Sequence, residues 1–351
     1  MATHISSNTP SGHAASLSAR QYAARKSAVT IAANISAIIV CFIMVFPAFS
    51  TLVLSFKQQA DVVRTPPLLF PCDTPSERFN PSACRFFTEG YQRILDLGPN
   101  PSALFGVEAR GRIINTYLPN TILYASAGSL LVTLLAGMAG YVFSRYPFRL
   151  KRLLLVSILA ITGIPLLTNL LALYQLVVDF RKATGPIFDQ LAASGQLTKD
   201  VARGLKDWQD RIVLIAIYVG FYLPLSIWIV KGFFDAIPRE LEEAALIDGA
   251  TPLEALLRVI APLAAPGLIA AFLLTFVNIW NEFIANYLIV GTSKQALRGV
   301  IVGVYDLTGN NLINYQVLAA ACVLVMLPVV LVFLFARRTF FQAMIEGAVK
   351  G

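Results

Sequence analysis

An acidic, sharply punctuated stretch at residues 238–254 contains the side chains best suited to specific chemistry. Three glutamates follow Pro238 closely: Glu240, Glu242 and Glu243. Proline suits the first position of a helix, and acidic side chains complement the positive end of the helix. Carboxylates held on a rigid helix can pair with basic groups of another protein. The alternative is an ordinary amphipathic loop of a membrane protein.

A second short helix is predicted directly after the first. Gly249 can adopt the left-handed turn that ends a helix. Thr251 and Glu254 have the spacing of a capping box, and Pro252 between them suits the first helical position. Pro262 is expected to end this second helix. Two short helices joined by a glycine elbow would make a rigid knob for docking.

A second polar set lies inside the apolar segment at about 264–290. Offsets of four place three side chains on one helical face, with Asn281 close by: Asn278, Glu282 and Asn286. A carboxylate in hydrocarbon is costly, so Glu282 is expected to face a polar cavity or a partner subunit. Packing inside the chain is the alternative.

Hydroxyl groups recur at helical spacing in two other apolar segments. One segment carries Tyr218, Tyr222 and Ser226, and the other carries Ser126, Ser129 and Thr133. Such groups can line a polar path or hydrogen-bond neighbouring helices, and for the serines and the threonine we favour the helix contacts.

The sequence lacks catalytic and metal-binding patterns. It has no G-x-x-x-x-G-K-[ST] phosphate loop, no nucleophile triad or acid pair in a soluble site, and no metal-spaced Cys/His cluster. We therefore assign no catalytic residue, metal or cofactor to this chain. Cys41 and Cys322 are expected to be small buried hydrophobes. Cys72 and Cys84 share a loop and could form a disulfide or remain free.

The composition is that of an integral membrane protein. The 351 residues are 56% hydrophobic and 14% charged, with a mean hydropathy of +0.67, which is too apolar for an ordinary soluble domain. The formal net charge is +8. Its basic residues lie mainly at the ends of apolar segments and in loops, so nucleic-acid binding is not expected.

Six apolar segments are long enough to cross a bilayer, which takes about 20 helical residues. They lie at about 28–56, 117–144, 151–178, 211–233, 264–290 and 314–336. Polar loops separate them at about 57–116, 145–150, 179–210, 234–263 and 291–313. The sequence therefore predicts an all-α integral membrane protein with six transmembrane helices at 28–351, preceded by a mobile arm at 1–27.

Basic residues indicate which loops face the cytoplasm. Four of them bunch at one short loop without an acidic residue: Arg145, Arg149, Lys151 and Arg152. The positive-inside rule places this loop in the cytoplasm, together with the tail that begins at Arg337 and Arg338. Both termini, the loop at 234–263 and the tail at 337–351 are then cytoplasmic.

Two of the outer loops are long. The loop at 57–116 looks like an irregular insertion, and that at 179–210 ends in an apolar pattern of helical period: Val201, Leu205, Trp208 and Ile212. This amphipathic helix could lie on the membrane or on a partner, but we expect it to pack on its own chain. Three prolines interrupt spans, as kinks or as tolerated residues: Pro47, Pro165 and Pro224.

Several motifs together resemble one known family. Glu243-Ala244-Ala245, Gly249-Ala250 and the run from Arg258 to Leu263 closely resemble the "EAA" loop of ATP-binding-cassette (ABC) importer permeases. Other matches are to the second permease of maltose-type carbohydrate importers: Phe46-Pro47 through Lys57, Gly140-Tyr141 with Ser144-Arg145, Trp280 through Phe283, and the tail to Gly351. The resemblance covers most of residues 28–351 and implies the type I importer permease fold, in the cell membrane. Ala261 departs from the larger aliphatic residue usual there.

The resemblance also implies roles for individual residues. In this family the EAA loop docks in a cleft of the ATPase, which assigns coupling to Glu243, Ala244, Ala245, Asp248 and Gly249. The family's tail inserts between the ATPase subunits, which assigns that contact to Gly347, Ala348, Val349, Lys350 and Gly351. In maltose-type permeases an outer loop reaches into the solute-binding protein, which assigns this scoop to Gly309, Asn310 and Asn311. A frayed terminus and a plain Asn-Gly turn are the alternatives.

An importer of this family needs a second permease, two ATPase subunits and an extracytoplasmic solute-binding protein, with ATP and Mg on the ATPase subunits. Sugars are neutral and rich in hydroxyls, which suits a pore or subunit interface lined by amide, carboxylate and phenol groups: Asn278, Asn281, Glu282, Asn286, Tyr218 and Tyr222. The same architecture could carry a polyol, glycerol phosphate or another solute. A stand-alone secondary transporter, which needs an ion-coupling site, and a structural scaffold are the remaining alternatives.

Overall fold

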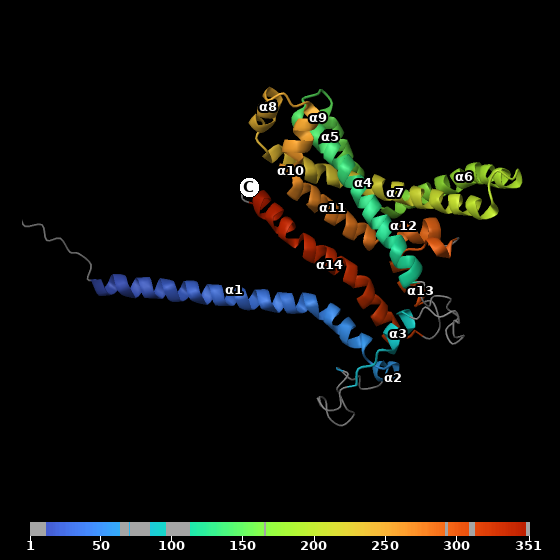
Figure 1. Cartoon of the computed structure of the whole chain (residues 1–351). Coiled ribbons are helices and arrows are strands. Elements are labelled where there is room, and N and C mark those ends of the chain that lie inside the picture. The colour runs from blue at the N-terminus through green and yellow to red at the C-terminus, as the bar shows by residue number, and fades with distance from the viewer. Residues whose placement is uncertain are drawn as a thin grey trace, which may run out of the picture.

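Long helices built from the predicted apolar segments dominate the computed structural model (Figure 1). The structure describes residues 12–63, 70, 85–95, 113–164, 166–291, 294–308 and 313–348. All regular elements within these ranges are helical, which confirms the all-α prediction for them. Four helices among them are long and apolar enough to cross a bilayer: α1 (Gly12–Ser55), α4 (Leu118–Arg145), α7 (Lys199–Ala236) and α14 (Tyr315–Ala348).

The other two predicted spans are broken helices. The helix over Pro252–Leu263 and α11 (Ala265–Trp280) meet at a bend of 74°, and together they make a fifth candidate span. The segment predicted at 151–178 is divided between α5 (Lys151–Ile161) and α6 (Leu166–Ala193). The 11 residues of α5 are too few to cross hydrocarbon alone. A sixth span therefore stays a prediction.

Shorter elements connect these helices. They are α2 (Gln59–Val62), α3 (Glu89–Leu95), η3 (Ile113–Tyr117), α8 (Glu240–Ile247), α9 (Pro252–Ala255), η4 (Leu256–Ile260), α10 (Ala261–Leu263), α12 (Ile284–Asn286), η5 (Tyr287–Gly291), η6 (Gln295–Leu297) and α13 (Val300–Asp306). We call residues 240–263, which hold α8 to α10, the elbow segment. Figure 1 shows α8 and α9 at the same end of the bundle as the C-terminal end of α14.

The helix α4 is central to the packing. It lies along α7 and against α11, while α14 packs against α1 and α11. Small residues permit the close approaches, as is typical of membrane helices. A Cβ added at Gly140 of α4 would lie 3.1 Å from the backbone nitrogen of Lys231 in α7, and one at Gly267 would lie 2.2 Å from the ring of Phe233.

Buried apolar side chains form two clusters along this helix packing. One cluster includes Tyr124, Tyr218 and Trp280. The other lies beside the elbow segment and joins Tyr141 of α4, Phe234 of α7 and Ile260 of η4. Because α4 and α7 contribute to both clusters, these two helices connect the elbow segment to the far end of the bundle.

The helices α6 and α7 form a hairpin that projects from the bundle (Figure 1). The predicted amphipathic helix is the first part of α7, continuous with the fourth span. The expectation that its apolar side chains pack on the chain was wrong, because they are 40–62% exposed: Val201, Leu205, Trp208 and Ile212. The opposite face of α7, with the buried Ala202 and Asp210, contacts α6 instead.

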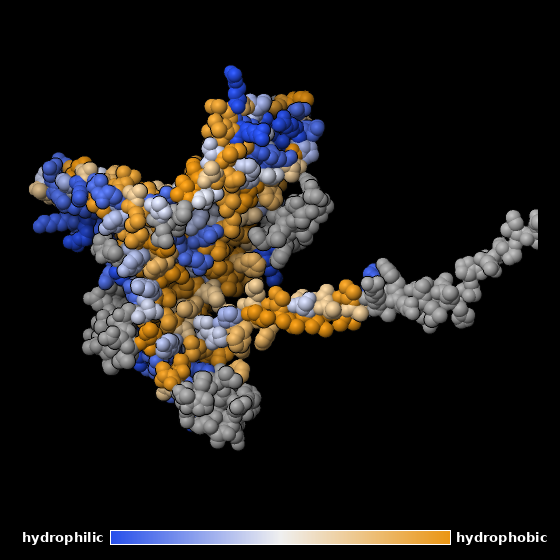
Figure 2. All heavy atoms as spheres, turned by 180° about the vertical axis from the view of Figure 1, so that it is seen from behind, coloured by the Kyte–Doolittle hydropathy of each residue, from blue (hydrophilic) through white to orange (hydrophobic). Residues whose placement is uncertain are grey.

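Hydrophobic atoms cover much of the surface between two hydrophilic ends (Figure 2). The hydrophilic ends are the elbow segment and the α6–α7 hairpin, as expected when the apolar surface between them faces lipid or a partner. In the described part of the chain, α1 packs mainly against α14 and leaves most of its apolar side chains exposed. Cys41 on α1 is therefore exposed, contrary to expectation, and Cys322 on α14 is half-buried.

Candidate functional site

The first helix of the elbow segment, α8, forms where the acidic pattern predicted it. Its first turn carries the three glutamates, and Arg239 is its N-cap residue. The helix begins at Glu240, so Pro238 lies before the cap and not at the first helical position, as the sequence had suggested. The acidic first turn still complements the positive end of α8.

Gly249 ends α8 as predicted. Its φ of 91° is in the left-handed region, where a residue without a Cβ is favoured. The N–H of Gly249 donates to the carbonyl of Leu246 (3.1 Å), and that of Ala250 donates to the carbonyl of Ala245 (3.0 Å). This pair of bonds is a Schellman motif, which fixes the direction of the chain after α8.

The second helix begins with the predicted capping box. The side chain of Thr251 accepts from the N–H of Glu254, and the carboxylate of Glu254 accepts from the N–H of Thr251. The prediction that Pro262 ends this helix was wrong, because the chain stays helical to Leu263 and bends at Ala264. Proline has no backbone N–H to donate within a helix. Here Pro262 comes directly after the wider π-type turn of η4 (Leu256–Ile260), whose hydrogen-bond pattern already departs from that of an α-helix.

The outward face of α8 has both charge and apolar area. Glu243, Ala244, Asp248 and Gly249 are exposed and Ala245 is half-buried. The carboxylate of Glu243 forms no ion pair within the described residues. Ile247, one turn after Glu243, is 85% exposed. A capped helix with an unpaired carboxylate beside an exposed isoleucine is a surface suited to a partner protein.

The neighbouring Glu242 points the other way. Its carboxylate lies 2.9 Å from Nε of Arg145 and accepts a hydrogen bond from the Tyr141 hydroxyl, and both partners are on α4. The positive-inside pattern assigns Arg145 to a short basic loop, but in the structure it is a buried residue in the last turn of α4. The sequence offered a weak signal, because Tyr141 and Arg145 are four residues apart on one helical face.

The polar set around Glu282 does not share one helical face as predicted. The chain leaves the helix between Trp280 and Ile284, so α11 and the short α12 are separate. Glu282 accepts from the backbone N–H groups of Ala285 (2.8 Å) and Asn286 (3.1 Å), and thereby caps α12. The Tyr218 hydroxyl donates to the same carboxylate (3.0 Å). Capping, rather than a continuous polar stripe, explains this glutamate.

The amides near Glu282 have different surroundings. Asn286 is buried and accepts from the N–H of Gly299 (2.8 Å). Asn278 and Asn281 are exposed, and each donates to a carbonyl of its own helix. Glu282, Asn286 and Tyr218 line one small cavity, whereas Asn281 lines a separate cleft of about 350 Å³. Four of the six predicted pore residues are thus divided between the cavity and the cleft, and Asn278 and Tyr222 line neither of them.

The hydroxyl pattern contains one contact between helices. The hydroxyls of Ser226 and Thr275 lie 3.2 Å apart and join α7 to α11, as favoured for the serines. Ser126 and Ser129 instead donate to carbonyls of their own helix α4. Tyr222 is half-buried near Tyr218 on α7, and Thr133 lies on α4.

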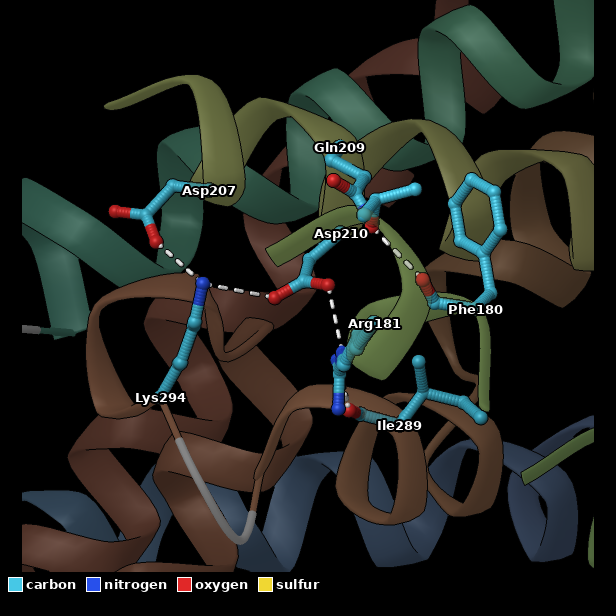
Figure 3. A network of polar contacts seen from close by, with 8 residues as sticks. Phe180, Arg181, Asp207, Gln209, Asp210, Ile289 and Lys294 are labelled. Atoms are coloured by element: carbon cyan, nitrogen blue, oxygen red, sulfur yellow. Dashed lines mark hydrogen bonds and ion pairs between the residues drawn. The ribbon is translucent and has the colours of Figure 1, made fainter. Parts of the chain in front are cut away.

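A charged cluster holds the hairpin to the bundle (Figure 3). Asp210 on α7 is buried, with Nε of Arg181 at 2.8 Å and Nζ of Lys294 at 2.9 Å. Arg181 also donates to the carbonyl of Ile289, and Lys294 to Asp207. Burial disfavours the charged lysine, but the two carboxylates outweigh it and raise the pKa of Lys294. Sequence reasoning missed this cluster, because its members are scattered over two predicted outer loops, at 179–210 and 291–313.

Some predicted residues fall outside the described part of the chain. These are the scoop residues Gly309, Asn310 and Asn311, the cysteines Cys72 and Cys84, and the last three residues, Val349, Lys350 and Gly351. Gly347 and Ala348 are at the end of α14. The assigned scoop, disulfide and tail contacts therefore stay predictions.

Known proteins resemble this chain over most of its length. The sequence profile of the binding-protein-dependent transport system inner membrane component matches residues 129–346. The trehalose transport system permease protein SugB of Mycobacterium tuberculosis is 32% identical over 244 residues, which are 69% of this chain and 79% of SugB. The maltose/maltodextrin transport system permease protein MalG of Vibrio vulnificus is 33% identical over 236 residues, which are 67% and 72% of the two chains.

A solved structure shares the fold. The crystal structure of a bacterial ABC transporter involved in the import of the acidic polysaccharide alginate contains a chain that matches with a TM-score of 0.56. The match covers 96% of this chain and 100% of that chain at 17% sequence identity. This structural similarity supports the arrangement of the helices and does not identify the solute.

Proposed function

From the membership of this chain in the family of binding-protein-dependent transport system inner membrane components, we propose that it is the permease subunit through which an ATP-driven importer passes a sugar or oligosaccharide. The chain is a multi-pass protein of the inner membrane and an ABC transporter permease. The proposal adds the solute class, the partners and the way in which ATP hydrolysis reaches the membrane helices.

One observation carries the coupling role. The elbow segment holds Glu243 and Ile247 on a rigid outward face at one end of a bundle of apolar helices. Rigid caps at Gly249 and Thr251 keep this face in place without help from a partner. A cytoplasmic ATPase with a basic side chain in an apolar cleft would complement both the carboxylate and the isoleucine.

The proposed mechanism is mechanical. Two ATPase subunits close on ATP and Mg, displace the EAA-type loops of this chain and of a second permease, and switch the pore between inward- and outward-facing states. The predicted arrangement of six spans with both termini in the cytoplasm would put the elbow segment and residues 347–351 on the ATPase side, and residues 309–311 on the side of an extracytoplasmic binding protein. Ala244 and Ala245 allow close approach, and Asp248 adds negative charge beside Glu243.

A sugar is the solute class that the relatives support best, because two of the similar permeases are named for trehalose and for maltose/maltodextrin. The cleft of about 350 Å³ that Asn281 and Trp280 line offers an amide and an aromatic ring, which match the chemistry of a neutral, hydroxyl-rich solute. A polyol or glycerol phosphate importer of the same architecture is the second candidate.

The division of labour between subunits gives the first test. This chain alone, purified and reconstituted in vesicles, is expected to show no sugar-stimulated phosphate release, because it lacks a phosphate-binding loop. Co-expression with the second permease, the ATPase subunits and the binding protein should restore it. Sugar-stimulated ATP hydrolysis by the isolated chain, or ion-gradient-driven uptake by it, would contradict the proposal.

A further inference from the structure

The motif Gly140-Tyr141 with Ser144-Arg145 connects the bundle to the elbow segment. It lies on the last turns of α4, where a spacing of four residues puts Tyr141 and Arg145 on the same face. That face meets Glu242, which is 101 residues after Tyr141 in the chain. The pattern therefore has a long-range structural role that its sequence does not reveal.

The contact is a single carboxylate that makes one hydrogen bond and one ion pair. One oxygen of Glu242 accepts from the Tyr141 hydroxyl, and the other lies 2.9 Å from Nε of Arg145. The side chains of Arg145 and Glu242 are only 6% and 13% exposed. Separating two opposite charges that have so little access to water is strongly unfavourable, because each is then left buried without its partner.

Two hydrogen bonds to the backbone brace this pair. Arg145 donates through Nη2 to the carbonyl of Ile237 (3.1 Å), just before α8. Arg239, the N-cap residue of α8, donates in return to the carbonyl of Ser144 (3.4 Å). The end of α4 and the beginning of α8 are thus tied in both directions.

Side-chain packing extends these contacts from α4 and α8 to α7. The ring of Tyr141 packs edge-on against that of Phe234, with centroids 5.9 Å apart. One residue earlier, Gly140 lets the backbone of α4 approach Lys231 of α7. Displacement of α8 would therefore act on two long helices together.

The adjacent residues Glu242 and Glu243 have different roles, one inside the chain and one at its surface. Successive helical residues point about 100° apart, and here one carboxylate is buried against α4 while the next is exposed. We propose that Glu242, Arg145 and Tyr141 form the joint through which a displacement of α8 moves α4. The inference rests on the proposed function, since the ATPase would supply the displacement.

The other end of α4 contacts the small cavity near Glu282, so a movement at the joint can reach that cavity. Thr121 and Tyr124 of α4 line the small cavity that also contains Glu282 and Asn286. Thr121 accepts from the N–H of Val300 (2.7 Å), and Tyr124 donates to the carbonyl of Leu297 (2.8 Å). A shift of α4 is thereby passed to the outer segment at 297–300. Glu242 and Arg145 act as positioning residues, remote from the solute.

The test uses the complete importer in vesicles and measures solute taken up per ATP hydrolysed. Glu242→Gln keeps the shape of the side chain and removes its charge, and we expect uptake per ATP to fall at least about tenfold, the effect of about 1.4 kcal/mol of lost coupling. Tyr141→Phe keeps both charges and should lower the ratio several-fold. ATPase subunits should still co-purify with both variants in normal amounts, because Glu243 is intact.

Two further variants separate a joint from general damage. Arg149→Gln removes the charge of an exposed arginine in the loop that follows α4, four residues after Arg145, and should leave the ratio unchanged. Glu242→Arg combined with Arg145→Glu restores a pair of opposite charges and should recover part of the coupling that each single change loses.

The outcomes separate this inference from the proposed function. Normal uptake by a Glu243→Lys importer would overturn the proposed function itself. Loss of uptake in Glu243→Lys, together with a normal ratio in Tyr141→Phe and in any assembled Glu242→Gln complex, would overturn the joint alone. If Glu242→Gln fails to assemble, Tyr141→Phe decides the question.

Discussion

Uptake by the assembled importer is expected to be lost when Glu243 is replaced by lysine. The exposed carboxylate of Glu243 makes no ion pair within the described part of its own chain, so its partner should lie on the ATPase. Loss of a charge pair buried at an interface costs about 2–5 kcal/mol. At about 1.4 kcal/mol per tenfold change, uptake should fall roughly 30-fold or more. The measurement is labelled solute accumulated in vesicles, divided by the amount of this chain in the membrane.

A matched control keeps this result specific. Asp200→Lys makes the same change of charge at a side chain that is 91% exposed on the α6–α7 hairpin, at a distance from the elbow segment. Its uptake should equal that of the unmodified importer. Undiminished uptake by Glu243→Lys would remove the coupling role from α8.

Replacement of Asp210 by asparagine should destabilise the protein more than other single changes in the hairpin. The buried Asp210 carboxylate is shared by Arg181 and Lys294 (Figure 3). Its loss leaves Arg181 without a carboxylate partner among the described residues, and leaves Lys294 with Asp207 alone. Removing one partner of a buried ion pair costs about 3–5 kcal/mol. The side chains of Arg181 and Lys294 are 25% and 30% exposed, so water partly compensates them. We therefore expect the free energy of unfolding to fall by about 3 kcal/mol, the lower end of that range. Thermal unfolding of the chain in detergent measures the loss.

The control for this experiment is Asp200→Asn. Asp200 pairs with Arg203 at the surface, with both side chains more than 70% exposed, and such pairs contribute about 0–1 kcal/mol. Since the pKa of Lys294 is raised, its stabilising contribution is complete below the ordinary lysine pKa and is lost only as the pH rises through the raised value. The difference between the two variants should therefore persist through neutral pH. Equal unfolding temperatures would show that the cluster contributes little.

Local rules explain which parts of the elbow segment could be predicted. The turn at Gly249 and the capping box of Thr251 and Glu254 depend on a few adjacent residues, and both are present. The helix boundaries at Pro238 and Pro262 were less predictable. The first depended on the chain leaving α7, and the second on the π-type turn of η4.

The polar face around Glu282 shows where periodicity alone fails. Offsets of four predict a shared face only if the helix continues, and here the backbone leaves it after Trp280. Glu282 itself stabilises the new start by accepting two backbone N–H groups. A side chain that can accept backbone N–H groups, placed within an apolar run, can indicate the start of a second helix. The same apolar run is equally consistent with one long span, so the sequence alone did not separate the two.

Pairing between distant segments was beyond the reach of the sequence. Arg145 fitted the positive-inside pattern, and only the approach of α8 to α4 reveals its partner Glu242. Likewise, Asp210, Arg181 and Lys294 come together because the hairpin folds back on the segment after α12. Long-range contacts of this kind follow from topology and not from local spacing.

The most direct test of the docking role of α8 is a photo-crosslinking amino acid at Ile247, the 85% exposed residue one turn after Glu243. Irradiation of intact importer in membranes should join this position to an ATPase subunit, identified by its phosphate-loop peptide. The same probe at Leu205, on the hairpin, should give no such product. Crosslinks from position 247 only to lipid, to this chain or to an extracytoplasmic protein would contradict the proposal that α8 receives the movement of the ATPase.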